Sequence, residues 1–172
     1  MANASPPPAT AAELRNIGLF AALSDEALAH LTASLTLVSP SPGEVVFLEG
    51  TEAREMYVVI SGEMEVVKRS KRGMDARVAL LGPGDWFGEM SILDVQPRSA
   101  TVRALAPTRM LRISSSDLDG LYRFDVKSYA LIVLNLAREL SRRLRVADCI
   151  IADFVASVTE SYHLQRNRAQ SP

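Results

Sequence analysis

Apolar positions follow helical spacing at both ends of the chain and gather into short runs in the middle. Within residues 11–37, Ser24 is a typical N-cap, because Asp25 and Glu26 follow it where the helix dipole favours acidic side chains. The apolar positions of this segment are Leu14, Ile17, Leu19, Phe20, Ala27, Leu28, Leu31 and Leu35. Their spacing predicts two short helices that meet near residues 21–23.

The middle of the chain, residues 38–113, has the pattern of an antiparallel β-structure. It holds seven of the nine glycines, and these separate short β-prone runs. The runs are Val45–Leu48, Met56–Ile60, Met64–Lys68, Arg77–Leu81, Thr101–Ala104 and Arg109–Ile113. Ser61–Gly62 and Lys71–Gly73 are typical of hairpin turns. Many short strands between frequent turn residues predict an antiparallel barrel or sandwich.

The last part of the chain returns to helical spacing. Ser114, Ser115 and Ser116 offer N-caps before Asp117, and a second helix is predicted to begin around residues 125–128. Its apolar positions step by four and three residues, as in a heptad: Val133, Ala137, Leu140, Leu144, Ala147, Ile151, Phe154 and Val158. A helix from 128 to 161 is roughly 50 Å long, more than one small barrel can cover. The unbroken seam predicts a homodimer, and the alternative is a helix that breaks and folds back.

Composition places few further limits on function. Of the 172 residues, 48% are hydrophobic and 23% are charged, which is ordinary for a soluble globular protein. The net charge of −1 does not favour nucleic acid as a partner. A single cysteine, Cys149, excludes an intramolecular disulfide framework. With neither a membrane span nor a secretory signal in the sequence, we expect a cytoplasmic protein. His30 and His163 belong to no metal-binding motif, so we expect no metal, no cofactor and no enzyme activity.

The segment from Gly82 to Ala104 carries the candidate chemistry. Gly88 is a position at which the backbone can approach a ligand closely, and residues 89–93 can form one helical turn whose start suits an anion. Arg98 follows Pro97, and a guanidinium binds a phosphate through two hydrogen bonds. Glu89 is an acceptor, which suits a ligand that also carries a hydroxyl group. Phosphate and sugar hydroxyl together indicate a nucleotide; the alternative is a surface loop with an exposed Arg–Glu pair.

The run FGEMSIL…PRSATVRA resembles the phosphate-binding cassette of cyclic-nucleotide-binding domains. This family includes catabolite activator proteins, protein kinase A regulatory subunits and cyclic-nucleotide-gated channels. The resemblance covers roughly residues 14–145, including 17–23 and 42–62. It implies a mainly β fold: an antiparallel β-barrel or jelly roll, a cupin-like double-stranded β-helix, preceded by short helices and followed by a long helix. One departure is Ala53-Arg54, where the family often has Gly-Asp.

The resemblance also implies a role for each cassette residue. Arg98 would pair with the cyclic phosphate, and Glu89 would accept a hydrogen bond from the ribose 2′-OH. Main-chain N–H groups and the Ser99 hydroxyl would bind ligand oxygens. The expected site residues are Phe87, Gly88, Glu89, Met90, Ser91, Arg98, Ser99 and Ala100, with Gly88, Ser91 and Ala100 giving the N–H groups. The base contacts are either Arg143 and Leu144 or Ala147 and Asp148, depending on which of AREL and SRRL matches the family pattern.

These expectations divide the chain into a disordered segment (1–10), a cyclic-nucleotide-binding domain (11–124), a lid and dimerisation helix (125–165) and a flexible tail (166–172). The first hypothesis is a sensor of cAMP, or less favourably cGMP, that acts on an output protein through the C-terminal helix. The second is a catabolite activator-like transcription regulator acting through other subunits. With about a dozen residues after the helix, we expect no helix-turn-helix domain and no DNA contact. The third is a dimerisation scaffold without a ligand.

Overall fold

The computed structural model describes residues 9–169, and describes side chains up to residue 160. Most of the segment predicted to be disordered (1–10) and the end of the predicted tail (166–172) therefore lie outside the described residues. The chain divides into two compact units, the first up to Asn135 and the second from Leu136 onward. No helix in the described range has the length and apolar character that a membrane span requires.

Three short helical elements open the first unit: α1 (Ala11–Arg15), the 3-10 helix η1 (Gly18–Phe20) and α2 (Asp25–Ser34). Ser24 caps α2 as predicted, accepting a hydrogen bond from the main-chain N–H of Ala27 at 3.2 Å. The first of the two predicted helices is instead divided into α1 and η1. Asn16 and Gly18 lie at the division, and both have low helix propensity.

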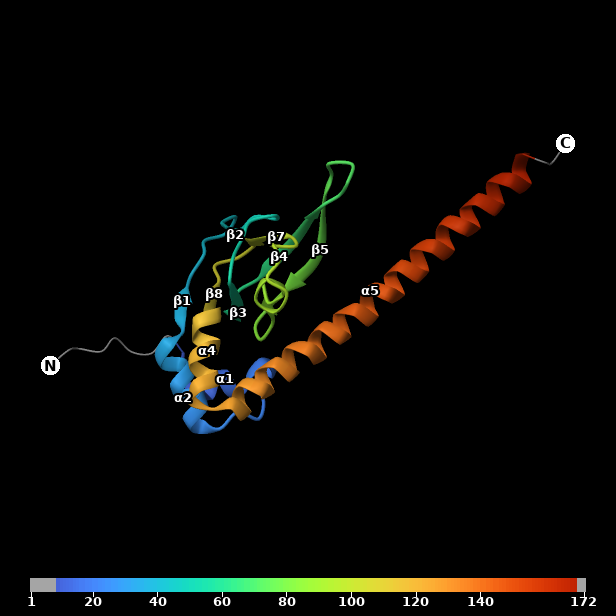
Figure 1. The fold of residues 1–172 in the computed structure, drawn as a ribbon. Helices are drawn as coiled ribbons and strands as arrows, with labels where there is room; N and C mark the ends of the chain where they lie inside the picture. The colour runs from blue at the N-terminus through green and yellow to red at the C-terminus, as the bar shows by residue number, and fades with distance from the viewer. Residues whose placement is uncertain (1–8, 170–172) are drawn as a thin grey trace. The chain divides into compact units, whose positions relative to one another are not determined.

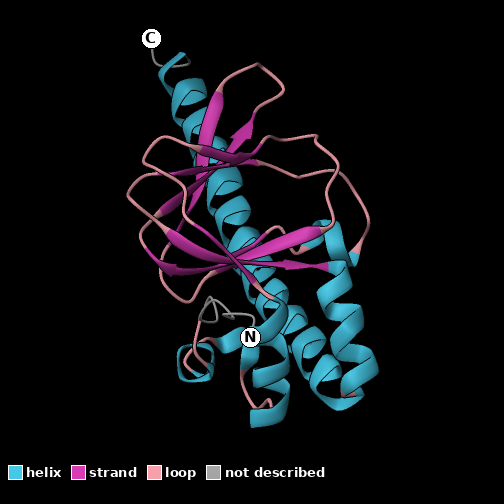
Figure 2. Ribbon diagram, turned by 90° about the vertical axis from the view of Figure 1, so that its left-hand side faces the viewer, coloured by secondary structure: helices cyan, strands magenta, loops and turns pink. Residues whose placement is uncertain are grey.

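Eight strands form two antiparallel sheets of four strands each. The strands are β1 (Thr36–Val38), β2 (Val45–Phe47), β3 (Glu55–Ser61), β4 (Met64–Arg69), β5 (Asp75–Leu81), β6 (Trp86–Phe87), β7 (Thr101–Ala104) and β8 (Arg109–Ser114). One sheet has the order β1-β8-β3-β6 and the other the order β2-β7-β4-β5. Figure 2 shows them as two separate layers of strands. The predicted β-rich fold is confirmed as two sheets rather than as a closed barrel, with all six predicted strands present.

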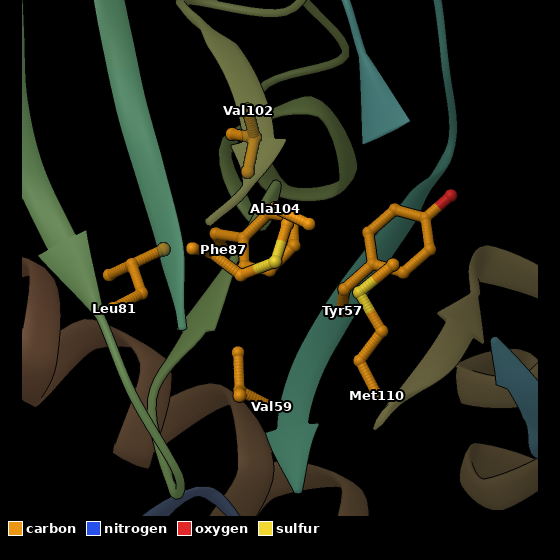
Figure 3. Packing of buried hydrophobic residues seen from close by; sticks show 8 residues of the cluster. Tyr57, Val59, Leu81, Phe87, Val102, Ala104 and Met110 are labelled. Carbon is orange, nitrogen blue, oxygen red and sulfur yellow. The ribbon is translucent and has the colours of Figure 1, made fainter. Parts of the chain in front are cut away.

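The core of the first unit lies between these sheets. Tyr57, Val59, Phe87 and Met110 come from one sheet, and Met64, Leu81, Val102 and Ala104 from the other. Figure 3 shows these side chains converging on one another. All eight are buried, which keeps the two layers together through apolar contact.

Helices cover one end of the sheets. α4 (Ser115–Phe124) packs against α2, and α1 packs against α2, as Figure 1 shows. Of the three serines predicted as possible N-caps, Ser114 caps α4, through a reciprocal pair of hydrogen bonds with Asp117. The final helix, α5 (Val126–Ala169), begins in this unit, and its Asn135 side chain donates to the carbonyls of Leu19 (3.1 Å) and Ala21 (3.3 Å). α5 continues to Ala169, the last residue that the structure describes, and so extends past residue 165, the predicted end of the helix.

Candidate functional site

The segment between β6 and β7 contains the short helix α3 (Met90–Leu93) and is organised around Arg98. The side chain of Arg98 is only 1% exposed. Its Nη1 donates to the carbonyl oxygen of Glu55 at 2.7 Å, to that of Gly88 at 3.1 Å and to Ser91 Oγ at 2.9 Å. Its Nη2 lies 3.4 Å from Glu55 Oε1. A buried guanidinium is thus held in one orientation from three directions.

The backbone and an aromatic ring fix Arg98 further. Its main-chain N–H donates to the carbonyl of Thr51, and its carbonyl accepts from the N–H of Gly50, both at 2.8 Å. The guanidinium carbon lies 3.9 Å from the centre of the Phe47 ring, which is a cation–π contact. Tyr57 and Phe87 lie next to Phe47, with ring centres 6.2 and 5.7 Å away. The cassette is therefore anchored on the loop after β2 and on the aromatic part of the core.

One edge of the Arg98 guanidinium remains available. Nε is buried and has no hydrogen-bond partner among the described residues. Nε and Nη2 present their N–H groups side by side, the edge that binds a carboxylate or phosphate with two parallel hydrogen bonds. Burial lowers the pKa of Arg98, while the nearby acids Glu55 and Glu89 and the phenol of Tyr57 act in the opposite direction. An arginine in a protein stays protonated, so the site is a buried cation whose Nε has no hydrogen-bond partner among the described residues.

Gly88 is required by the position of Arg98. Its φ of +81° lies in the left-handed region, which favours glycine. A Cβ atom built on Gly88 would lie 2.5 Å from Arg98 Nη1 and 3.2 Å from the carbonyl oxygen of Glu55. Any side chain at this position would push the guanidinium away from its partners.

Glu89 and Ser91 complete the buried polar part of the cassette. Glu89 is 3% exposed and directly precedes α3. Its negative charge acts to raise the pKa of Arg98, against the effect of burial. Ser91 is 2% exposed, and its hydroxyl donates to the carbonyl of Gly88 at 2.9 Å while accepting from Arg98. Beside an anion-binding cation, a buried carboxylate can accept a hydrogen bond from a hydroxyl of the same ligand.

The remaining predicted cassette residues lie around this centre. Phe87 is in the apolar core, and Ala100 is buried immediately before β7. Met90 is half exposed, with its sulfur 3.6 Å from the hydroxyl of Ser99. The carbonyl of Ser99 accepts a hydrogen bond from Lys68 Nζ. The eight predicted residues thus come together in one part of the first unit.

The candidate base contacts lie elsewhere in the chain. Arg143, Leu144, Ala147 and Asp148 are on α5, in the second unit. Arg143 is half-buried and its Nε donates to Glu139 at 3.1 Å, one turn earlier, while the other three are exposed. Their contact with a base stays a prediction.

Sequence reasoning missed the residues that hold Arg98 from outside the cassette. Glu55 and Phe47 lie 43 and 51 positions before it and belong to β3 and β2. The segment before Glu55 did carry a signal, because Ala53-Arg54 departs from the family pattern at that point. In the structure, the carboxylate of the next residue, Glu55, contacts the guanidinium of Arg98.

Comparison with known proteins identifies the family of this chain. The family model of the cyclic nucleotide-binding domain matches residues 37–124, which include the whole cassette. The chain belongs to the cyclic nucleotide-binding domain family. The match ends at the last residue of α4, so it includes strands from both sheets and the helix that follows them.

Several relatives share this domain. A CRP-like cAMP-activated global transcriptional regulator from Mycobacterium tuberculosis is 33% identical over 142 residues, covering 83% of this chain and 62% of that protein. The catabolite activator protein of Thermus thermophilus superimposes with a TM-score of 0.69 and 34% identity, over 78% of this chain and 61% of that one. A cyclic nucleotide-binding domain from Methylobacillus flagellatus gives a TM-score of 0.71 at 26% identity, over 78% of this chain and 75% of that one. The chain thus spans about three fifths of the mycobacterial relative.

Proposed function

We propose that this chain is a cyclic-nucleotide sensor that binds the cyclic phosphate on the free edge of Arg98. The phosphate would take hydrogen bonds from Nε and Nη2, while Glu89 would accept from the ribose 2′-OH. Gly88, Ser91 and Ala100 would supply main-chain N–H groups, and Ser99 its hydroxyl. Phe87 would flank the ligand from the apolar core, and Met90 from the solvent side.

The observation that carries this proposal is the buried Nε of Arg98, which has no partner among the described residues. A buried donor without an acceptor costs free energy, and more so when it is part of a charged group. A phosphate on this edge would satisfy the donor and neutralise the cation together. A structural arginine would instead have all its donors satisfied by the protein.

We favour cAMP over cGMP as the ligand. Two relatives are described by their response to cAMP: the mycobacterial cAMP-activated regulator and the Thermus thermophilus cyclic AMP receptor protein, which is 38% identical over 106 residues. Asp148, if it reaches the base, can accept a hydrogen bond from the exocyclic amine of adenine, but also from the donors of guanine. The ratio of the two affinities decides between the nucleotides.

We also propose that the chain forms a homodimer through α5 and signals to an output protein by movement of this helix. Residues 144–160 of α5 are all exposed, and they include seven large apolar side chains: Leu144, Val146, Ile150, Ile151, Phe154, Val155 and Val158. A helix with so much exposed apolar surface requires a partner in water. The heptad spacing supports a second copy of the same helix.

A second candidate function is transcription regulation through other subunits. It is favoured by the mycobacterial relative, of which this chain spans 62%. Arg138, Arg142, Arg143 and Arg145 would then contact the DNA backbone. The test is DNA binding that weakens as salt rises; absence of binding at low salt contradicts it.

Calorimetric titration with cAMP and cGMP tests the sensor proposal. Arg98→Ala should weaken binding on the order of 100-fold or more, because it removes the charged partner of the phosphate. The control is Arg72→Ala, the same change of charge on an exposed residue of the β4–β5 turn, and it should bind like the wild type. Circular dichroism verifies that both variants fold. Equal affinity of Arg98→Ala and wild type contradicts the role assigned to Arg98, and no binding by the wild type supports the ligand-free scaffold instead.

A further inference from the structure

We propose that the Glu55 carboxylate is the resident counter-ion of Arg98, and that a ligand phosphate must displace it to bind. This inference rests on the proposed function, since it concerns the same binding edge. It makes Glu55 a positioning residue that lowers the affinity of the site for its anion.

The competition follows from the geometry of the guanidinium. Glu55 Oε1 lies 3.4 Å from Arg98 Nη2, one of the two nitrogens of the free edge. A phosphate bound to Nε and Nη2 would meet this carboxylate at close range, and two anions repel each other strongly where solvent is excluded. The Glu55 side chain is 35% exposed, so it can turn toward water without breaking the core. The carboxylate also accepts a hydrogen bond from the Tyr57 hydroxyl, at 3.4 Å.

The orientation of Arg98 does not depend on that carboxylate. The main-chain carbonyl of Glu55 accepts from Nη1 at 2.7 Å, and Gly88 and Ser91 hold the same nitrogen. These contacts survive when the Glu55 side chain is changed or moves. Removal of the carboxylate should therefore leave the binding edge in place and free of a competing anion.

The position of Glu55 also connects the site to α4. Glu55 is the register partner of Ser114 across β3 and β8, and Ser114 is the N-cap of α4. The carbonyl of the preceding residue, Arg54, accepts from the main-chain N–H of Ser115 at 2.9 Å. A change at Glu55 thus reaches the first turn of α4 through adjacent main-chain hydrogen bonds, and α4 leads directly into α5.

The experiment compares Glu55→Gln with Glu52→Gln. Glu52 is an exposed acid three residues earlier, so both variants lose the same charge from the same segment. Two quantities are measured: the affinity for cAMP by calorimetry, and the midpoint of thermal unfolding without ligand. Glu55→Gln should bind cAMP about five- to tenfold more tightly, because the repulsion between like charges is removed. Its ligand-free midpoint should fall, because a buried cation loses its counter-ion. Glu52→Gln should change neither.

If Glu55 is a counter-ion, Glu55→Gln raises the affinity for cAMP and lowers the midpoint of thermal unfolding. If Glu55 has a merely structural role, the same substitution lowers both quantities. Equal or weaker cAMP binding by Glu55→Gln, with tight binding by the wild type, overturns this inference and leaves the sensor proposal intact. Absence of binding by the wild type overturns both. Hydrogen exchange gives a second readout that does not require the variant: cAMP should change the protection of amides at residues 115–118 in the wild type. No change there overturns the connection to α4.

Discussion

At the scale of single residues, the site depends on a glycine as much as on an arginine. Gly88 and Gly84 both have a positive φ, +81° and +90°, but only Gly88 faces other atoms: a Cβ on Gly84 would meet nothing within 4 Å. Alanine at either position therefore introduces similar backbone strain. Only alanine at 88 also collides with Arg98, whose guanidinium is the group that has to move.

Gly88→Ala should consequently lose both stability and binding, and Gly84→Ala only stability. We expect each to lose about 1–2 kcal/mol of unfolding free energy, the usual cost of a left-handed residue with a Cβ. Nucleotide affinity should fall on the order of tenfold or more in Gly88→Ala, since a displaced guanidinium loses aligned hydrogen bonds, and stay unchanged in Gly84→Ala. Urea denaturation and calorimetry measure the two effects. Equal affinities in the two variants would contradict the role assigned to Gly88.

Individual site residues were predictable from the sequence only where their partners are near in the chain. Gly88, Ser91 and Arg98 lie within eleven positions of one another, and their types suit an anion. Glu55 and Phe47 reach Arg98 only because two sheets bring distant strands together. No local pattern marks either of them as a partner of the cassette.

At the scale of elements, local signals predicted the caps and the longer strands. Ser24 and Ser114 act as N-caps because the acceptor and its target lie three residues apart. β6 was missed because it has only two residues, and β1 because residues 36 and 37 were assigned to the helical segment 11–37. Pairing with β8 and with β3 makes them strands, and pairing is set by the fold rather than by the segment itself.

The junction of α4 and α5 gives a prediction about pH. The side chain of Asp125 accepts hydrogen bonds from the Ser128 hydroxyl and from the main-chain N–H of Lys127. The hydrogen bond from Ser128 is the main cause of a lowered pKa at Asp125. A carboxylate whose pKa is lower in the folded chain stabilises the fold above its unfolded pKa of about 3.9, and this contribution is lost as pH falls through the folded value.

Asp125→Asn keeps an acceptor at this position but removes the titrating group. Its stability should be below that of the wild type at neutral pH, and the difference should disappear as pH falls below about 4. Ser128→Ala, which removes the main cause of the shift, should reduce the same pH-dependent difference. Urea denaturation between pH 7 and pH 3 measures it. A difference that persists unchanged at low pH would show that the charge of Asp125 contributes nothing.

At the scale of the whole molecule, the homodimer proposed through α5 can be assigned an orientation from the residues that flank the seam. With Leu144, Ile151 and Val158 at the first seam position and Ala147 and Phe154 at the second, Arg143 and Asp148 flank the seam on opposite sides. In a parallel, in-register pair of helices, such flanking residues five apart face each other across the interface. Arg143 of one copy would then meet Asp148 of the other, twice in each dimer. In an antiparallel pair these two positions do not meet.

The orientation of the dimer can be tested by exchanging these charges. Asp148 makes no ion pair within the described chain, so Asp148→Arg acts mainly by opposing the partner's Arg143. In a parallel dimer this variant should dissociate about tenfold more readily, because two weak attractions become repulsions, and adding Arg143→Glu should restore most of the affinity. Asp153→Arg, the same change on the outer face of the helix, is the control and should dimerise normally. Analytical ultracentrifugation measures the affinities, and calorimetry with cAMP separates this effect from any contact of Asp148 with the base. Failure of the second substitution to restore the dimer would exclude the parallel arrangement, because only that arrangement places residues 143 and 148 opposite each other.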